Sequence, residues 1–331
     1  MTHTTPDHSS NKSSGIRGYI NIEPASLKIE QKRSLCSWKL QVRRLPAPRM
    51  ANPTNAEALK AWELNASFWD QHMGYEGNDY YRIVELPSLE RMAAVKPGDR
   101  ALDLATGNGL VARWLASKGA RVIATDGSQA MIDHAKHRST NANGENINSI
   151  SYQILDATST QSFENFITKE TAEEGPFDIV VMNMAIMDIA TLEPLAAALP
   201  KLLKQNTGRF VATLLHPLIT AGSTRVLEYG DSRETGREEE HVSLKITTYL
   251  HSPAPMKAEA MKGQPFYQYT FHRPIHEVLS PFLRSGLVLD AFEEPNFDQE
   301  YNNSRQIDPR SLRYVTEIPK ILAFRMRTIG Y

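Results

Sequence analysis

Short apolar runs alternate along most of the chain with longer stretches in which apolar residues recur every three or four positions. The first pattern is typical of buried parallel strands, and the second is typical of amphipathic helices. Their alternation predicts an α/β protein with a doubly wound, mostly parallel sheet covered by helices on both faces. Strands are expected near residues 101–104, 121–125, 151–155, 178–182 and 209–215, and helices at 86–95, from 110 onward, at 128–138, 162–173 and 193–204.

The alternation stops after residue 215, which separates a later insert from the rest of the main domain. This domain is expected to span residues 100–331, and the insert within it to span residues 216–273. An insert of this length suits a lid over a substrate, because long connections in compact domains are commonly functional. A helix at 275–284 and strands at 287–292 and 321–327 are expected to close the fold.

Two further segments precede the main domain. Residues 1–49 are polar and then basic, which predicts a disordered or basic N-terminal extension, with a mitochondrial presequence as the functional alternative. Residues 50–99 are expected to form a helical cap that includes an amphipathic helix at 55–63. Within this cap, the segment 65–81 is dense in aromatic residues and glycine and is expected to be a loop. Such density in a loop favours packing against a flat or apolar ligand.

The stretch 100–115 combines a short apolar strand, a glycine turn and the start of a helix. Gly107 and Gly109 allow a sharp turn and the close approach of a ligand, and the helix N-terminus offers unpaired N–H groups. The spacing also fits the dinucleotide fingerprint, with Asp126 as the ribose acid. Asp103 at the end of the strand favours S-adenosylmethionine, because a carboxylate repels a pyrophosphate but attracts sulfonium and ammonium groups.

Four more segments continue the pattern that the glycine turn begins. They are R-V-I-A-T-D at 121–126, I-L-D-A at 154–157, F-D-I-V-V-M-N-M at 177–184 and G-R-F-V-A-T-L-L-H-P at 208–217. Together with D-L-A-T-G-N-G at 103–109, they resemble in order and spacing the motifs of class I S-adenosylmethionine-dependent methyltransferases. The resemblance implies a Rossmann-like sheet of seven strands, the last two antiparallel, under an N-terminal helical cover.

The same resemblance assigns roles to residues around the cofactor. It implies that Asp126 accepts hydrogen bonds from the ribose hydroxyls and that Asp156 and the next backbone N–H contact adenine. The backbone of Ala105 and Thr106 would contact the methionine part. The full set of expected cofactor-binding residues is Asp103, Ala105, Thr106, Gly107, Gly109, Asp126, Gly127, Ser128, Met131, Asp156, Ala157 and Asn183.

Candidate residues for the acceptor side come from the cap, from strand ends and from the end of the insert. The candidate catalytic residues are His272, His216 and Asp188. A histidine or an acid can remove a proton from an oxygen or thiol acceptor, although His272 is equally typical of a structural histidine. The candidate acceptor-binding residues are Trp69, Met73, Asn78, Tyr80, Tyr81, Tyr267 and Arg273. For Arg273, an ion pair with Glu293 or Glu294 is the favoured expectation.

The resemblance implies transfer of a methyl group to an O, N or S atom of a small molecule. Asn183 is followed by Met-Ala-Ile rather than by the Pro-Pro-aromatic sequence of enzymes that methylate nucleic-acid bases or glutamine. This departure favours an aromatic or polyketide-like acceptor, such as a secondary metabolite. The alternatives are an NAD-dependent oxidoreductase and a cofactor-binding protein without methyl transfer, such as a pericyclase. No cluster of acids indicates a metal site.

Composition and charge argue against nucleic acid and membrane as partners of this chain. The chain has 331 residues and a net charge of −1, and no basic groove in the core indicates a nucleic-acid partner. No apolar run is long enough to span a membrane. The single cysteine, Cys36, excludes disulfides within the chain and favours a cytoplasmic location, or a mitochondrial one if residues 1–49 are a presequence. A monomer or a homodimer is expected.

Overall fold

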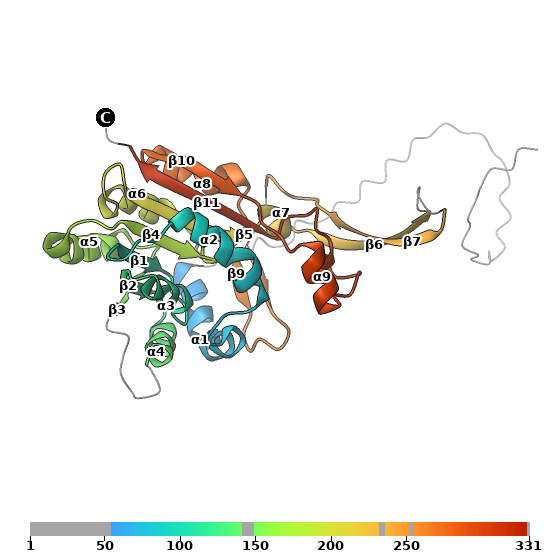
Figure 1. Cartoon of the computed structure of the whole chain (residues 1–331), viewed down its shortest axis with the longest axis horizontal. Coiled ribbons are helices and arrows are strands. Elements are labelled where there is room, and N and C mark those ends of the chain that lie inside the picture. The colour runs from blue at the N-terminus through green and yellow to red at the C-terminus, as the bar shows by residue number, and fades with distance from the viewer. Residues whose placement is uncertain (1–53, 141–148, 232–235, 252–254, 330–331) are drawn as a thin grey trace, which may run out of the picture. The chain divides into compact units, whose positions relative to one another are not determined.

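The central sheet has seven strands in the order β10-β11-β5-β4-β1-β2-β3 (Figure 1). It belongs to a computed structural model that describes residues 54–140, 149–231, 236–251 and 255–329, so the predicted extension 1–49 lies outside the described residues. The strands are β1 (Arg100–Leu104), β2 (Arg121–Asp126), β3 (Ile150–Ile154), β4 (Ile179–Asn183), β5 (Arg209–Leu215), β10 (Leu287–Glu293) and β11 (Ile321–Thr328). All seven predicted strands are therefore confirmed.

Strand direction agrees with the predicted sheet except at one strand. β1 pairs in parallel with β2 and β4, and the parallel pairing continues to β3 on one side and β5 on the other. β11 is antiparallel to both β5 and β10, so β10 runs in the same direction as the parallel strands. The expectation that both closing strands are antiparallel is wrong for β10. A single reversed strand, β11, is enough to place the chain end between β5 and β10.

Helices cover both faces of this sheet, as the alternating pattern predicts. The helices that follow strands are α3 (Leu110–Ser117), α4 (Gln129–Arg138), α5 (Thr160–Glu174), α6 (Glu193–Leu202) and α8 (Ile275–Arg284), and α2 (Leu86–Ala93) precedes β1. Leu102 and Leu104 share one apolar cluster with residues of α5, α6 and α8. Ala101 points to the other face and joins residues of α2 and α3. β1 is buried along its whole length, which explains its unbroken apolar character.

The N-terminal cap is more helical than the sequence pattern indicates. α1 spans Asn55–Met73, well beyond the predicted 55–63, and starts at a capping box between Thr54 and Glu57. Gly74 ends the helix with a positive φ of 61°. A π-helical segment, η1 (Tyr80–Glu85), then leads directly into α2. The expectation of a loop over 65–81 is therefore wrong for most of its length, because the aromatic residues continue the helix and pack from it.

The insert after β5 contains two hairpins that pair only within themselves. A short helix, α7 (Pro217–Thr220), is followed by the pair β6 (Thr224–Asp231) and β7 (Glu238–Lys245) and by the pair β8 (Met256–Ala258) and β9 (Gln268–Thr270). None of these insert elements was predicted, and neither were three short segments outside the insert: η2 (Ile186–Asp188), α9 (Gln299–Arg305) and η3 (Leu312–Tyr314). In the part of the chain that the structure describes, no helix is long and apolar enough to cross a bilayer.

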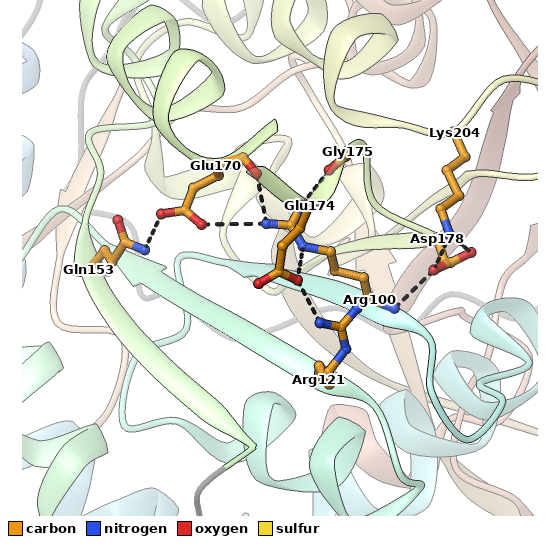
Figure 2. A network of polar contacts seen from close by, with 8 residues as sticks. All are labelled: Arg100, Arg121, Gln153, Glu170, Glu174, Gly175, Asp178 and Lys204. Carbon is orange, nitrogen blue, oxygen red and sulfur yellow. Dashed lines mark hydrogen bonds and ion pairs between the residues drawn. The ribbon is translucent and has the colours of Figure 1, made fainter. Parts of the chain in front are cut away.

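At the amino-terminal ends of the parallel strands, Arg100 is the centre of a polar network (Figure 2). Its side chain is only 4% exposed. The guanidinium donates to the backbone carbonyls of Gly175, at 2.5 Å, and Glu170, at 3.0 Å. It also lies 3.4 Å from a carboxylate oxygen of Glu170 and 3.4 Å from one of Glu174. Four acceptors therefore share one buried cation.

The rest of this network pairs the remaining charges. Asp178 accepts from Lys204 Nζ at 2.8 Å and from the backbone N–H of Arg100 at 2.9 Å. Burial alone would raise the pKa of Asp178, but these two donors outweigh it and the pKa is lowered. Glu174 also accepts from Arg121 at 2.6 Å. Each carboxylate of the network therefore has a cation beside it.

Candidate functional site

The candidate site lies at the carboxyl-terminal ends of β1 and β4, where the strand order reverses. From β1 the chain continues through β2 to β3, whereas β4 and β5 lie on the other side of β1. Open parallel sheets bind ligands in the crevice at such a switch point. Two non-glycine residues with positive φ, Ala105 at 55° and Met184 at 54°, directly follow β1 and β4. Backbone of this kind is held at a cost and is frequent at functional sites.

The glycine turn after β1 has the predicted geometry. Gly107 and Gly109 have φ values of 57° and 80°, and Gly109 caps the N-terminus of α3. The Thr106 N–H donates to the Thr125 carbonyl at 2.8 Å, which ties the turn to the end of β2. A Cβ on Gly109 would lie 3.1 Å from the Cβ of Ala135 on α4. The turn therefore depends on glycine for both its conformation and its packing.

Two acids of the predicted cofactor set stand on neighbouring strand ends. Asp103 is 1% exposed and accepts from the Thr106 hydroxyl at 2.5 Å, and burial raises its pKa to about 7. Asp126 accepts from the backbone N–H groups of Gly107 and Ser128, each at 2.9 Å. Burial raises the pKa of Asp126 to about 6, against the opposing effect of those two donors. Both carboxyls are held in place by the turn itself.

Other predicted cofactor residues follow β2 and β3, and two of them bond to side chains of α1. Asp156 accepts from Asn55 Nδ2 at 3.1 Å and from the Thr158 hydroxyl at 2.7 Å. Ser128 caps α4 through the Met131 N–H, as predicted, and donates to Glu63 at 2.5 Å. Met131 and Ala157 are buried.

One face of α1 therefore covers the residues after β2 and β3 that are expected to bind the adenosine part of the cofactor. A Cβ on Gly127 would lie 2.8 Å from Leu59. Asn55, Leu59 and Glu63 are four residues apart in sequence and so share one face of the helix. Sequence analysis did not single out these three residues, although their spacing was visible within the predicted amphipathic helix.

At the end of β4, Asn183 connects two elements. Its Oδ1 accepts from the Thr213 hydroxyl of β5 at 2.6 Å, and its Nδ2 donates to Glu85 at 3.0 Å. Glu85 belongs to η1 and is 3% exposed. Burial raises its pKa to about 7, and the bond from Asn183 acts in the opposite direction. Sequence analysis missed Glu85, because only the fold brings it to a residue 98 positions away.

The aromatic candidates of the cap take different places. Tyr81 is buried, its hydroxyl has no hydrogen-bond partner among the described residues, and burial with the nearby Asp103 and Glu85 raises its pKa. Asn78 Oδ1 accepts from the Tyr81 N–H at 3.0 Å, near the start of η1. Tyr80 packs edge-on against Phe297, at a centroid distance of 4.9 Å.

The other two candidates in the cap lie on α1. Trp69 donates to Gln268 of β9 at 3.1 Å. Met73 packs against the apolar cluster that contains Leu89 and Val111. Of the seven acceptor-binding candidates, Tyr81 is therefore the one that the fold brings beside Asp103 and Glu85.

Both candidate histidines use their ring nitrogens within the fold. His216 accepts from the Leu218 N–H at 3.2 Å and lies 2.8 Å from Glu294 through Nε2, and burial lowers its pKa. His272 Nε2 lies 2.7 Å from the Tyr249 carbonyl, which can only accept, and its Nδ1 lies 2.9 Å from the Thr220 hydroxyl. These bonds give each ring a structural role.

The remaining acceptor candidates surround η2 and the insert. Arg273 donates to the carbonyls of Ile186, Ile189 and Ala190 at 2.8–3.1 Å, so the expected pair with Glu293 or Glu294 does not form. Those glutamates instead contact Arg91 and His216. Backbone carbonyls that follow β4 therefore take the place of the expected carboxylate as partners of the guanidinium.

Asp188 ends η2 with a buried carboxyl. No hydrogen-bond partner of this carboxyl occurs among the described residues, and burial raises its pKa well above the usual range. Tyr267 is exposed and lines an open pocket of about 510 Å³ between α1 and the segment 257–269. In the described ranges, no group of three His, Cys, Asp or Glu side chains is arranged to hold a metal ion.

Comparison with known proteins assigns this arrangement to a family. Residues 101–206, which run from β1 past α6, match the family model described as a methyltransferase domain. The matched region is a methyltransferase domain, and together with the relatives it supports a class I S-adenosylmethionine-dependent methyltransferase. S-adenosylmethionine is the cofactor of this class, and the dinucleotide reading of the glycine turn is not favoured.

Individual relatives of this methyltransferase are distant. Ubiquinone biosynthesis O-methyltransferases from strains of Acinetobacter baumannii are 24% identical over 160 residues, which is 48% of this chain and 62% of theirs. The match therefore spans less than two thirds of those relatives. An S-adenosylmethionine dependent methyltransferase from Mesorhizobium loti superposes with a TM-score of 0.52 at 22% identity, over 77% of this chain and all of that one. This likeness shows the shared fold.

Proposed function

We propose that the protein transfers a methyl group from S-adenosylmethionine to an O, N or S atom of an aromatic or polyketide-like small molecule. One observation supports S-adenosylmethionine as the methyl donor. Asp156, Asp126 and Asp103 follow or end the adjacent strands β3, β2 and β1. This order suits the adenine, ribose and methionine parts of the cofactor laid across the strand ends. The match of residues 101–206 to a methyltransferase domain supports the same assignment.

Transfer requires an acceptor held in line with the breaking C–S bond. Of the three candidate catalytic residues, Asp188 suits this task best, because both histidines are engaged in structural bonds. Its carboxyl is 7% exposed and has no hydrogen-bond partner in the described part of the chain. Burial raises its pKa well above the usual range, which favours the protonated form of the carboxyl. In this role Asp188 would orient the acceptor by donating a hydrogen bond.

The insert and α1 together support the proposed lid. Asn65 of α1 donates to the Phe266 carbonyl at 2.8 Å and accepts from the Phe266 N–H at 3.1 Å. Trp69 adds a third bond, to Gln268. The side of α1 that bears Leu59 and Glu63 faces the expected cofactor residues. A movement of the insert would therefore be transmitted to the cover of the cofactor.

The proposal is tested by incubating the purified protein with S-adenosylmethionine bearing a deuterated methyl group and with a panel of phenols, thiols and amines. Mass spectrometry is expected to show the deuterated methyl group on at least one acceptor class. Asp103→Asn, which keeps the shape of the side chain but removes its charge, should lose this product. Cofactor binding without a methylated product from any class would favour a non-methylating protein on this fold.

A further inference from the structure

A second buried carboxyl, that of Glu85, is bound at the end of β4, the strand next to the one that bears Asp103. Asp103 is on β1 and Asn183 is at the end of the neighbouring strand β4, where Leu104 pairs with Met182. Glu85 belongs to η1, and its carboxyl accepts a 3.0 Å hydrogen bond from Asn183 Nδ2. The Thr213 hydroxyl fixes the orientation of the Asn183 amide, since it donates to Oδ1 and leaves Nδ2 for Glu85. The carboxyl of Glu85 is thus positioned from two strands.

Neither buried carboxyl is paired with a cation. Asp103 accepts from the Thr106 hydroxyl and from the backbone of Ala112, and Glu85 accepts from the Asn183 amide. Among the described residues, no Lys or Arg forms an ion pair with either, and Arg113 acts on Asp103 only at longer range. The neighbouring Tyr81 hydroxyl is buried without a partner. Burying carboxyls in this way is unfavourable unless a positive ligand joins them.

S-adenosylmethionine brings two positive centres, an ammonium and a sulfonium. Its demethylated product, S-adenosylhomocysteine, keeps the ammonium and has a neutral sulfur. Across the strand ends, the acids at β3, β2 and β1 account for adenine, ribose and the methionine ammonium. The next strand in the sheet is β4, and the carboxyl held there is that of Glu85. Asp188, the residue proposed to orient the acceptor, also follows β4.

We propose that Glu85 is a cofactor-binding residue whose carboxylate faces the sulfonium, so that the site binds S-adenosylmethionine more tightly than S-adenosylhomocysteine. The inference rests on the proposed function, in which S-adenosylmethionine is the methyl donor. Loss of the sulfonium charge on methyl transfer removes the attraction to Glu85. The product therefore lacks one attraction that the methyl donor has.

The first test compares the two ligands by calorimetry in the wild type and in Glu85→Gln. The variant keeps the shape of the side chain and removes the charge. We expect its Kd for S-adenosylmethionine to rise by about tenfold or more, and its Kd for S-adenosylhomocysteine to change by less than about threefold. The matched control is Glu90→Gln on α2, which removes an exposed carboxylate that contacts Lys118 at 2.9 Å. Both affinities of the control should equal those of the wild type.

Two results would overturn the assignment. An equal loss of affinity for both ligands would place Glu85 at the ammonium or in a structural role. Unchanged affinity for both would remove Glu85 from the cofactor site. A protein that shows the expected discrimination but methylates no acceptor would support the assignment of Glu85 and contradict the proposed function, so the two failures are distinguishable.

A second measurement needs no variant. The Asn183 amide acts directly on Glu85, and Glu85, Asp103, Glu90 and Arg113 all act electrostatically on the nearby Tyr81. Near pH 7 both buried carboxyls are partly protonated, and a cation favours their ionised forms. Binding of S-adenosylmethionine should therefore release more protons than binding of S-adenosylhomocysteine, measured by calorimetry in buffers of different ionisation enthalpy. Equal proton release by both ligands would contradict the proposal.

Discussion

Buried carboxyls have cationic partners at one end of the parallel strands and neutral partners at the other. At the amino-terminal ends, Arg100 and its neighbours pair each carboxylate of the network with a cation (Figure 2). At the carboxyl-terminal ends, Asp103 and Glu85 are equally buried, and their hydrogen-bond partners are neutral. One end has its charges balanced within the chain, whereas the carboxyls at the other end have only neutral hydrogen-bond partners. Under the proposed function, the first region stabilises the fold and the second recognises the cofactor.

The pKa values follow the same division. Lys204 and the Arg100 N–H lower the pKa of Asp178 at the amino-terminal end against the effect of burial. At the carboxyl-terminal end, burial raises the pKa of Asp103 and of Glu85 to about 7 in each case. A carboxyl with a lowered pKa stabilises the fold when ionised, and one with a raised pKa stabilises it when protonated. Rising pH is therefore expected to weaken the stabilising contribution of Glu85 and Asp103, whereas falling pH is expected to weaken that of Asp178.

The largest effect is expected from Arg100→Met. The substitution leaves the carbonyls of Glu170 and Gly175 without their donor and removes the cation next to Glu174. Breaking a buried ion pair by removing one partner costs about 3–5 kcal/mol of unfolding free energy. Urea denaturation measures this loss, and calorimetry should show S-adenosylmethionine affinity unchanged in the protein that remains folded. A stability loss below about 1 kcal/mol would mean that the network is not structural.

The next effect is a pH dependence of stability that Glu85 causes. Its pKa rises from 4.5 to about 7 on folding, so the folded state binds more protons than the unfolded state between these values. Its stabilising contribution is full below about pH 4.5 and is lost as the pH rises to 7, an effect of about 3 kcal/mol. Urea denaturation of the ligand-free protein across this range should show the decline, and Glu85→Gln should make it shallower.

Asp178→Asn provides the control from the other end of the strands. The pKa of Asp178 is lowered, so its contribution is present at higher pH and is lost only as the pH falls toward and below 3.8. The control should therefore lower stability by a constant amount between about pH 5 and 7 without changing the slope. If Glu85→Gln leaves the slope as it is in the wild type, the buried carboxyl does not gain a proton on folding.

A smaller effect is expected from Asp126→Ala, and on binding rather than on stability. Asp126 anchors the N–H groups of Gly107 and Ser128 and is the expected acceptor for the ribose hydroxyls. Loss of hydrogen bonds to a charged acceptor should weaken S-adenosylmethionine binding by about 1–3 kcal/mol, measured by calorimetry. Unfolding of the variant should be monitored in parallel, since the same carboxyl holds the turn. An unchanged affinity would contradict the ribose assignment.

These residues also show what the sequence could predict. Asp103, the two turn glycines and Asp126 lie within 24 positions, and local strand and turn patterns place them correctly. Glu85 could not be found in this way, because its role depends on a contact with Asn183 on another element. The length of α1 was missed because aromatic residues and glycine near its end resembled a loop, although the helix continues to Met73. Local patterns predicted the turn, and long-range contacts determined what surrounds it.

The smallest effect is expected from Arg121→Gln at the outer part of the amino-terminal network. Arg121 lies 2.6 Å from Glu174, but its side chain is 61% exposed. Water screens such a pair, and exposed ion pairs contribute about 0–1 kcal/mol. Glu174 also keeps its contact with Arg100 after the substitution. Urea denaturation should therefore place Arg121→Gln close to the wild type and far from Arg100→Met. Equal losses in both variants would mean that burial does not distinguish these two cations, and the contrast between the two strand ends would then depend on the number of charges rather than on their burial.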